Sequence, residues 1–151
     1  MQKIIEKLNK YFDVRELVSP AVYNQFGANA WIVFDKRLLE TLLALRADIL
    51  CVPLVCNNWR AGGANKQRGF RENVCPICKE KTEAGRLYVS AHTIGKGVDL
   101  SSPKMDADTM RKTIEKNKSK LPYPVRIEAG VSWLHIDTMT ISTDKITYFK
   151  A

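Results

Sequence analysis

Three short stretches near the end of the chain alternate between apolar and polar residues, and this pattern constrains the fold more than any other feature. The stretches are YPVRIEAG (123–130), VSWLHIDTMTI (131–141) and KITYFK (145–150). Successive side chains of a strand point to opposite faces, so the alternation predicts strands. We expect tight turns to join them into an antiparallel unit. In the middle strand, Trp133, His135 and Asp137 would share one face, and Leu134 and Ile136 the other.

The first part of the chain favours helices instead. Apolar residues recur at helical spacing over residues 3–12 and 35–48, and both patterns predict amphipathic helices. Ser19 followed by Pro20 is typical of a helix start. Helices followed by a sheet predict an α+β fold. The length of 151 residues favours a single domain over residues 1–151.

The middle of the chain is less regular. LCVPLVCNNW (50–59) is of β type, whereas the Gly- and charge-rich stretch 60–86 has no clean period. An irregular segment of this length is usually functional, and we expect it to shape specificity. Residues 87–102 predict two short extended pieces around a glycine-containing turn. Residues 105–120 predict a helix, with acidic residues in its first turn and basic residues in its last, as the helix dipole favours.

Charge and hydropathy limit the classes of function. The net charge of +8 favours an anionic partner, but the basic residues are spread from Lys3 to Lys150 and their densest run, 111–120, is typical of a solvated helix face. Anionic cell-wall polymers would use this charge as well as nucleic acid would. No stretch approaches the roughly 18 apolar residues that span a bilayer, and the start of the chain lacks the features of a secretory signal. We expect synthesis in the cytoplasm, no membrane insertion and a monomer.

Four cysteines raise the possibility of a structural zinc site. VCPICKEK (74–81) looks like one half of a zinc ribbon. Its partner pair would have to be Cys51 and Cys56, whose spacing points them to opposite faces of an extended strand. We therefore expect buried or reduced thiols rather than a four-cysteine site, with a disulfide between Cys75 and Cys78 possible in an oxidising setting.

The chain has only two histidines, and each lies in a short stretch that also holds an aspartate. His92 and Asp99 flank TIGKGV (93–98), whose glycines can turn the chain back on itself, and His135 lies within a predicted strand. Two imidazoles, one carboxylate and an open position would form a catalytic zinc site with three protein ligands. A histidine beside a glycine turn is more commonly an ordinary polar residue, so spacing alone leaves both interpretations open.

A resemblance favours the zinc site. SAHTIGKGVD (90–99) is similar to the S-x-H-x-x-G-x-A-x-D signature of the zinc peptidases of the D-Ala-D-Ala carboxypeptidase and Hedgehog superfamily. Gly97 replaces the alanine, a small-for-small change that we expect to matter little. WLHID (133–137) resembles the later strand motif of this superfamily, and RGFR (68–71) resembles its upstream G-[YF]-R element. The similarity covers about residues 35–149, and the whole chain resembles the compact peptidases of bacteriophages and related bacteria.

The resemblance implies a Hedgehog- or DD-peptidase-like fold, with a central, mainly antiparallel sheet flanked by helices. It implies that His92, Asp99 and His135 bind Zn²⁺. It further implies that Arg71 reaches the scissile carbonyl or the substrate carboxylate, and that Ser90 hydrogen-bonds nearby. The implied substrate is a peptidoglycan stem peptide with D-amino acids near the cut. A phage-type lytic enzyme, or endolysin, would act on the cell wall after release from the cytoplasm or by non-classical export.

Three further residues complete the expected site. Asp137 could orient a ligand or be a solvated carboxylate, and Trp133 could contact substrate or pack in the core. Many family members place the general base three residues before the last histidine, where this chain has Ser132, which cannot take a proton at neutral pH. We expect Glu128 to be the base, with Asp137 in reserve, against the alternative that Glu128 is an ordinary surface carboxylate.

Two other classes of function stay open. The serine at the usual position of the base favours a non-catalytic zinc-binding domain on the same scaffold. A basic nucleic-acid-binding protein is the third possibility, and it predicts an affinity for DNA or RNA that falls steeply with salt.

Overall fold

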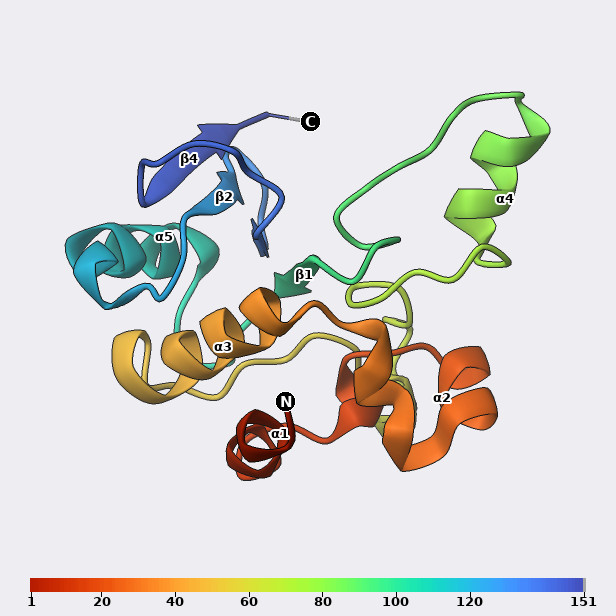
Figure 1. Ribbon diagram of the computed structural model, residues 1–151, viewed down its shortest axis with the longest axis horizontal. Helices are drawn as coiled ribbons and strands as arrows, with labels where there is room; N and C mark the ends of the chain where they lie inside the picture. The colour runs from red at the N-terminus through yellow and green to blue at the C-terminus, as the bar shows by residue number, and fades with distance from the viewer. Residues whose placement is uncertain (151) are drawn as a thin grey trace.

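The chain folds around a four-stranded mixed sheet flanked by helices, which is the α+β class that the sequence predicts (Figure 1). The computed structural model describes residues 1–150. In spatial order the strands are β1 (Gly97–Leu100), β3 (Leu134–Asp137), β2 (Val125–Glu128) and β4 (Ile146–Phe149). β1 and β2 both run antiparallel to β3, while β2 and β4 are parallel.

The helices form largely where apolar spacing and capping residues predict them. They are α1 (Gln2–Leu8), α2 (Pro20–Phe26), α3 (Lys36–Ala44), α4 (Pro76–Glu83) and α5 (Ala107–Lys116). Shorter 3₁₀ segments lie at Val14–Glu16, Gly27–Val33, Trp59–Ala61 and Lys118–Lys120, and a π-helical turn at Leu45–Ile49 continues α3. The hydroxyl of Ser19 accepts from the backbone N–H of Val22 at the start of α2, as the sequence predicts.

The third strand of the predicted antiparallel unit pairs differently from the prediction. β4 lies beside β2 and parallel to it, rather than being joined to β3 by a tight turn. The connecting segment 138–145 is longer than a tight turn and carries the chain across to the far side of β2. Parallel neighbours require a crossover of this kind, and the alternation within a strand does not indicate it.

The strand predicted over residues 50–59 is absent. This segment pairs with the sheet only through an isolated bridge between Val55 and Ser101. Pro53 has no N–H to donate to a ladder, and Cys51 has a positive φ of 55°. Likewise, of the two extended pieces predicted over 87–102, only the second forms a strand, β1.

The stretch 60–86, predicted to be irregular, contains α4. Cys75 caps this helix, because its Sγ accepts from the backbone N–H of Cys78 at 3.3 Å, and Pro76 occupies the first helical position. A polar side chain followed by proline is the same signal that identified α2. It was missed here because cysteine is not a usual capping residue.

The two faces of the sheet differ in their chemistry. One face consists of fully buried side chains that belong to the hydrophobic core, namely Val98, Leu100, Val125, Ile127, Leu134 and Ile136. The residues between them point to the other face. There, Asp99 lies opposite His135 in the pairing of β1 with β3, and Glu128 lies beside Phe149 in the pairing of β2 with β4. The second face therefore carries a row of ionisable and aromatic side chains across all four strands.

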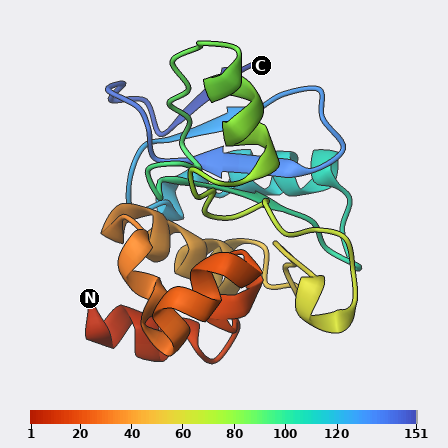
Figure 2. The ribbon, with the colours of Figure 1, turned by 90° about the vertical axis from the view of Figure 1, so that its right-hand side faces the viewer.

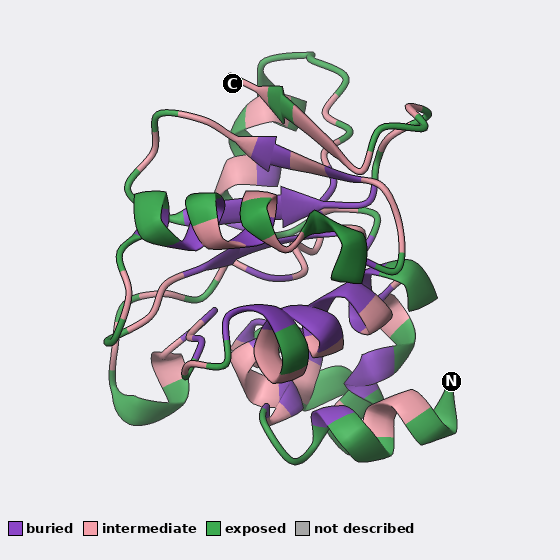
Figure 3. Cartoon of the chain, turned by 90° about the vertical axis from the view of Figure 1, so that its left-hand side faces the viewer, coloured by how far each residue is buried: buried purple, intermediate pink, exposed green. Residues whose placement is uncertain are grey.

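The helices surround the sheet unequally. In Figure 1, α5 lies on one side of the strands, and α4 stands apart on the other side at the end of two long connections. Figure 2 shows the N-terminal helices packed below the strands. Figure 3 shows buried residues concentrated in the strands and in the parts of the helices that face them. No helix among residues 1–150 has the length and apolar character needed to cross a membrane.

A buried arginine ties α5 to the turn between β2 and β3. The Arg111 side chain is only 8 % exposed. Its guanidinium donates to three backbone carbonyls around that turn, those of Glu128, Val131 and Trp133, at 3.0, 2.6 and 2.6 Å. The arginine therefore fixes the facing ends of the two central strands.

Replacing Arg111 by methionine should destabilise the fold, because three carbonyl groups would lose a charged donor. The expected decrease is about 3 kcal/mol in the free energy of unfolding, measured by urea denaturation. Lys112→Met, at an exposed position of the same helix, is the matched control and should change this free energy by less than about 0.5 kcal/mol. Equal effects of the two substitutions would show that the buried arginine does not stabilise the turn.

Candidate metal centre

Three side chains from separate parts of the chain converge on one point. Nε2 of His92, Oδ1 of Asp99 and Nδ1 of His135 all lie within 4.8 Å of one another, and all three residues are buried. The two nitrogens are 3.3 Å apart, and Asp99 Oδ1 lies 3.4 Å from His92 Nε2 and 2.8 Å from His135 Nδ1. Ligands of a tetrahedral ion with bonds of about 2.0–2.1 Å lie about 3.4 Å apart. We call this group the triad, and it could hold a metal ion.

The fold brings the triad together in two ways. Asp99 and His135 are direct partners in the pairing of β1 with β3, so the register of the sheet sets their separation. His92 precedes β1 in a turn that contains Gly95, whose φ is +68°. A Cβ atom on Gly95 would lie 2.0 Å from the carbonyl oxygen of Val33, so the turn excludes a side chain both by its backbone conformation and by lack of space.

Hydrogen bonds on the outer side of each imidazole direct a lone pair toward the shared point. Nδ1 of His92 donates to the carbonyl oxygen of Gly69 at 2.8 Å, and Nε2 of His135 donates to Oδ2 of Asp137 at 3.0 Å. Since a carbonyl and an ionised carboxylate only accept, each ring carries a proton on that outer nitrogen. Metal-binding histidines are commonly oriented in this manner.

Three acceptor atoms that face one point need a positive charge between them. Burial alone lowers the pKa of His135, but its hydrogen bonds to Asp137 and Asp99 outweigh burial and raise the pKa to about 9. Burial raises the pKa of Asp99, yet the adjoining rings of His135 and His92 outweigh burial and hold the pKa well below its usual range. A proton on His135 can supply the charge, and a divalent ion would displace that proton.

Asp137 is fully buried rather than solvated. In addition to His135, its carboxylate accepts from Nε and Nη2 of Arg126 at 2.9 and 3.0 Å and from the backbone N–H of Met139 at 2.8 Å. Burial raises the pKa of Asp137, but its hydrogen bonds, above all the one to His135, outweigh burial and lower the pKa. An ionised carboxylate in this position fixes the ring of His135.

The triad lines a cleft of about 320 Å³. All the site residues that the sequence predicts line the same cleft: Arg71, Ser90, His92, Asp99, Glu128, Trp133, His135 and Asp137. Trp133 is 37 % exposed, so it belongs to the wall of the cleft and not to the core. The Ser90 hydroxyl accepts from the N–H of Thr93 at 3.4 Å and so stabilises the turn that holds His92.

Arg71 lies beside the triad and is held on three sides. Its Nη2 is 3.4 Å from Oδ2 of Asp99, its Nε donates to the carbonyl oxygen of Gln67 at 2.8 Å, and its Nη1 donates to the hydroxyl of Tyr88 at 3.1 Å. Its backbone N–H donates to the carbonyl oxygen of His92. The guanidinium is therefore oriented before any ligand binds.

Glu128 lies on β2, level with His135 on β3. This follows from the pairing of Ile127 with Ile136, because the next residue of β2 then lies beside the preceding residue of β3. Glu128 is half-buried and lines the cleft. Ser132, at the position where the resembled family has its base, is exposed and does not line the cleft.

Gly97 is not interchangeable with alanine in this chain. A Cβ atom at this position would lie 2.7 Å from Cβ of Ala91 and 3.2 Å from Cβ of Asp137. The first distance is shorter than two carbon atoms can approach. An alanine at position 97 would therefore require the turn at Ala91 to shift, because β1 lies directly against this turn.

The cysteines provide no second site of this kind. All four are free thiols, and only Cys51 is exposed. Within residues 1–150, the triad is the only group of three or more potential ligands that lie close enough to hold an ion. Burial raises the pKa of Cys56 well above its usual range, so this thiol stays protonated.

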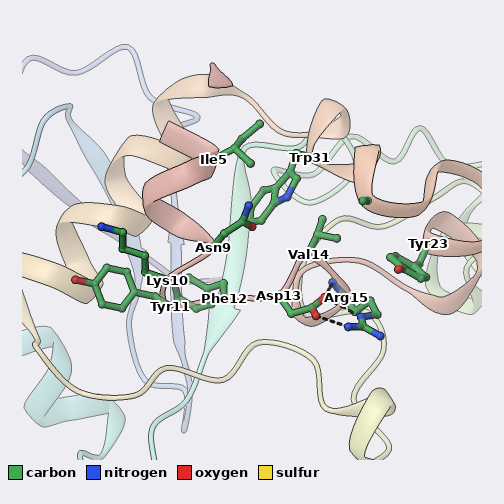
Figure 4. A pocket seen from close by; sticks show the side chains of 11 residues that line it. Ile5, Asn9, Lys10, Tyr11, Phe12, Asp13, Val14, Arg15, Tyr23 and Trp31 are labelled. Atoms are coloured by element: carbon green, nitrogen blue, oxygen red, sulfur yellow. Dashed lines mark hydrogen bonds and ion pairs between the residues drawn. The ribbon is translucent and has the colours of Figure 1, made fainter. Parts of the chain in front are cut away.

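A larger cleft, of about 590 Å³, lies among the N-terminal helices and shares no lining residue with the first. Figure 4 shows its walls, where Asp13 and Arg15 point toward each other and form an ion pair. Arg60 adds a second cation to the same carboxylate. Since its only carboxylate is already paired and no histidine or cysteine lines it, this cleft lacks the chemistry that the smaller one has.

Three residues of the site were missed in the sequence, namely Arg126, which binds Asp137, Tyr88, which binds Arg71, and Phe149, whose ring centroid lies 5.6 Å from that of His135. Arg126 was detectable, because it shares a strand face with Glu128. Tyr88 and Phe149 depend on contacts between distant segments, which no local pattern indicates.

Comparisons of the chain with models of protein families, with curated proteins and with solved structures find no match. The interpretation of the site therefore depends on its residues and their geometry.

Added Zn²⁺ is a probe of this site and should stabilise the protein, because an ion held by the triad would bind the folded chain and not the separated ligands of the unfolded chain. At about 100 times the dissociation constant, the melting temperature should rise by about 5 °C or more, measured by differential scanning calorimetry before and after addition of a chelator. His92→Ala should abolish the rise. A rise of equal size in this variant would place the bound ion elsewhere.

Asp137→Asn should weaken the binding of Zn²⁺ about 10- to 100-fold, because an amide no longer fixes the proton on Nε2 of His135 by its charge. Competition with a chromophoric chelator measures this affinity. Asp144→Asn, at an exposed position, is the matched control and should leave the affinity unchanged. If both variants bind equally well, Asp137 has no part in metal binding.

Proposed function

We propose that the protein is a zinc-dependent peptidase that hydrolyses peptide bonds in peptidoglycan stem peptides. The observation that carries the proposal is the convergence of His92 Nε2, Asp99 Oδ1 and His135 Nδ1 within one open cleft. The three segments that resemble the D-Ala-D-Ala carboxypeptidase and Hedgehog superfamily all contribute to this cleft. RGFR supplies Arg71, SAHTIGKGVD supplies two residues of the triad, and WLHID supplies the third.

The chemistry of the ligands favours zinc. Two imidazoles and one carboxylate, whose ligand atoms lie between 2.8 and 3.4 Å apart, are a common donor set for this ion. When bound, Zn²⁺ would lower the pKa of a water to about 7 and polarise the carbonyl of the scissile bond. Hydrogen bonds from His92 to Gly69 and from His135 to Asp137 keep both imidazoles in the state that can bind the ion.

Two other side chains would act directly on the substrate. Glu128, in the same row of the sheet as Asp99 and His135, would accept a proton from the attacking water and pass it to the leaving amine. Arg71 would stabilise the negative charge that develops on the carbonyl oxygen, or bind a substrate carboxylate. Its contacts with Gln67 and Tyr88 hold it in place, which reduces the cost of ordering it in the transition state.

The proposed substrate class follows from the resemblance together with the charge of the protein. A net charge of +8 suits an anionic cell-wall polymer, and Arg71 and Arg126 both line the cleft, where they would attract the carboxylates of a stem peptide. We propose a phage-type lytic role, with a monomer that reaches the cell wall after release from the cytoplasm.

The decisive experiment combines metal analysis with mass spectrometry of digested peptidoglycan. We expect one equivalent of zinc per chain, and stem peptides shortened at one defined bond. His92→Ala should lose both the zinc and the cleavage. The proposed peptidase function would be contradicted if the purified, zinc-loaded protein left both stem peptides and whole cell walls uncut.

Glu128→Gln should lower kcat by about 10²- to 10⁴-fold while zinc stays bound, because the amide cannot take up the proton. The rate of release of new amino groups from peptidoglycan measures the effect. Glu83→Gln, on the exposed end of α4, should behave as the unmodified protein. Activity retained in Glu128→Gln would exclude Glu128 as the base.

A non-catalytic zinc-binding domain is the second candidate. The observation in its favour is Ser132, which occupies the usual position of the base and is exposed outside the cleft lining. This candidate predicts that zinc binds with the stoichiometry above and that Glu128→Gln changes nothing measurable.

A further inference from the structure

The segment that returns from α4 to the metal cleft has unpaired backbone groups. Figure 1 shows it as a long run of chain without helix or strand. Within residues 1–150, Leu87, Tyr88 and Val89 make no backbone–backbone hydrogen bond. The residues on either side are anchored, because the N–H groups of Arg86 and Ser90 both donate to the protein. Three consecutive residues are therefore held in place with their amides free.

The side chains of this segment alternate as they would in a strand. Leu87 is 94 % exposed and Val89 is 55 % exposed, whereas the hydroxyl of Tyr88 between them accepts from Arg71. An unpaired edge with exposed apolar side chains is a template for another strand, and proteins usually protect such edges with charges, proline or a covering element. None of the three residues is charged or a proline, so the segment carries none of the side chains that usually protect an unpaired backbone from pairing.

The position of the segment identifies what it would bind. Val89 and Ser90 line the metal cleft, and Tyr88 contacts the same arginine whose Nη2 lies 3.4 Å from Asp99. Trp133, also in the cleft lining, is 37 % exposed. A peptide that lies along residues 87–89 would therefore enter the cleft directly. A second copy of the protein would have to insert one of its own strands there.

We propose that residues 87–89 bind the peptide substrate by strand addition, in which the main chain of an extended peptide forms hydrogen bonds with this segment. The N–H groups of Leu87 and Val89 would point to the same edge and bind the peptide. Main-chain pairing provides affinity, and the exposed side chains select what lies beside them. The inference depends on the proposed peptidase function, because it names how that substrate is held.

A proline substitution tests the pairing directly. Val89→Pro removes a backbone N–H that has no backbone partner in the free protein, so it costs no backbone hydrogen bond of the native fold. Val89→Ala is the matched control, since it removes the same side chain and keeps the N–H. With a soluble stem peptide as substrate, KM should rise about tenfold more in Val89→Pro than in Val89→Ala, as expected for the loss of one or two hydrogen bonds. The zinc content should be equal in both, and kcat should change little.

Amide hydrogen exchange followed by NMR provides a readout that does not need activity. We expect the amides of Leu87 and Val89 to exchange rapidly in the zinc-loaded protein. They should become protected when the same stem peptide is added to the Glu128→Gln variant, because this variant should bind the peptide without cutting it. Circular dichroism of the Val89 variants checks that the fold is intact, and the exchange experiment stands even if a proline variant fails to fold.

The outcomes separate this inference from the proposed function. If the peptide is cut while the amides stay unprotected and the two Val89 variants have equal KM values, strand addition is overturned and the proposed peptidase function stands. If a peptide protects the amides but the unmodified protein never cuts it, the proposed peptidase function is overturned and strand addition stands. Protection that depends on protein concentration without peptide would assign the edge to a second copy of the chain, and a stem peptide that neither binds nor is cut would overturn both.

Discussion

The register of β1 against β3 is the constraint on which the site depends. Asp99 and His135 face each other because these two strands pair antiparallel with this alignment. A shift by one residue would exchange them for the apolar residues that now fill the core. The burial of Val98 and Ile136 on the opposite face therefore also fixes the geometry of the candidate metal centre. The same hydrophobic contacts that stabilise the sheet hold its ionisable residues together.

A second layer of charge pairing supports this arrangement. Arg126 neutralises Asp137, which in turn orients His135, and Arg111 holds the carbonyl groups at the ends of the strands. Both arginines reach their partners from outside the triad, so its three acceptor atoms remain directed at one point. A buried group of this kind is stable only when each outer hydrogen bond is satisfied. Hydrogen bonds behind the triad therefore contribute to its shape as much as the three residues themselves.

The sequence predicted the local features of this molecule better than its long-range ones. Alternation located β2, β3 and β4. A serine followed by proline located α2, and acidic residues before basic ones indicated α5. These signals depend on neighbours within a few residues. The parallel pairing of β4 depends on a crossover connection, which the alternation within a strand does not indicate. The failure of residues 50–59 to form a strand depends on Pro53, which interrupts an otherwise β-type run. The triad was found because histidine is rare here and its spacing matched a motif. Tyr88 and Phe149 were missed because only the folded chain brings them near.

The chain leaves the site at Arg71 and comes back at Ser90 by way of α4, and the backbone of Arg71 is hydrogen-bonded to that of His92. This hydrogen bond joins the two ends of the excursion where it begins and ends. The part of the chain beyond this closure, which includes α4, supplies none of the three residues of the triad. The length and sequence of this excursion are therefore less constrained by the triad than the segments that carry His92, Asp99 and His135.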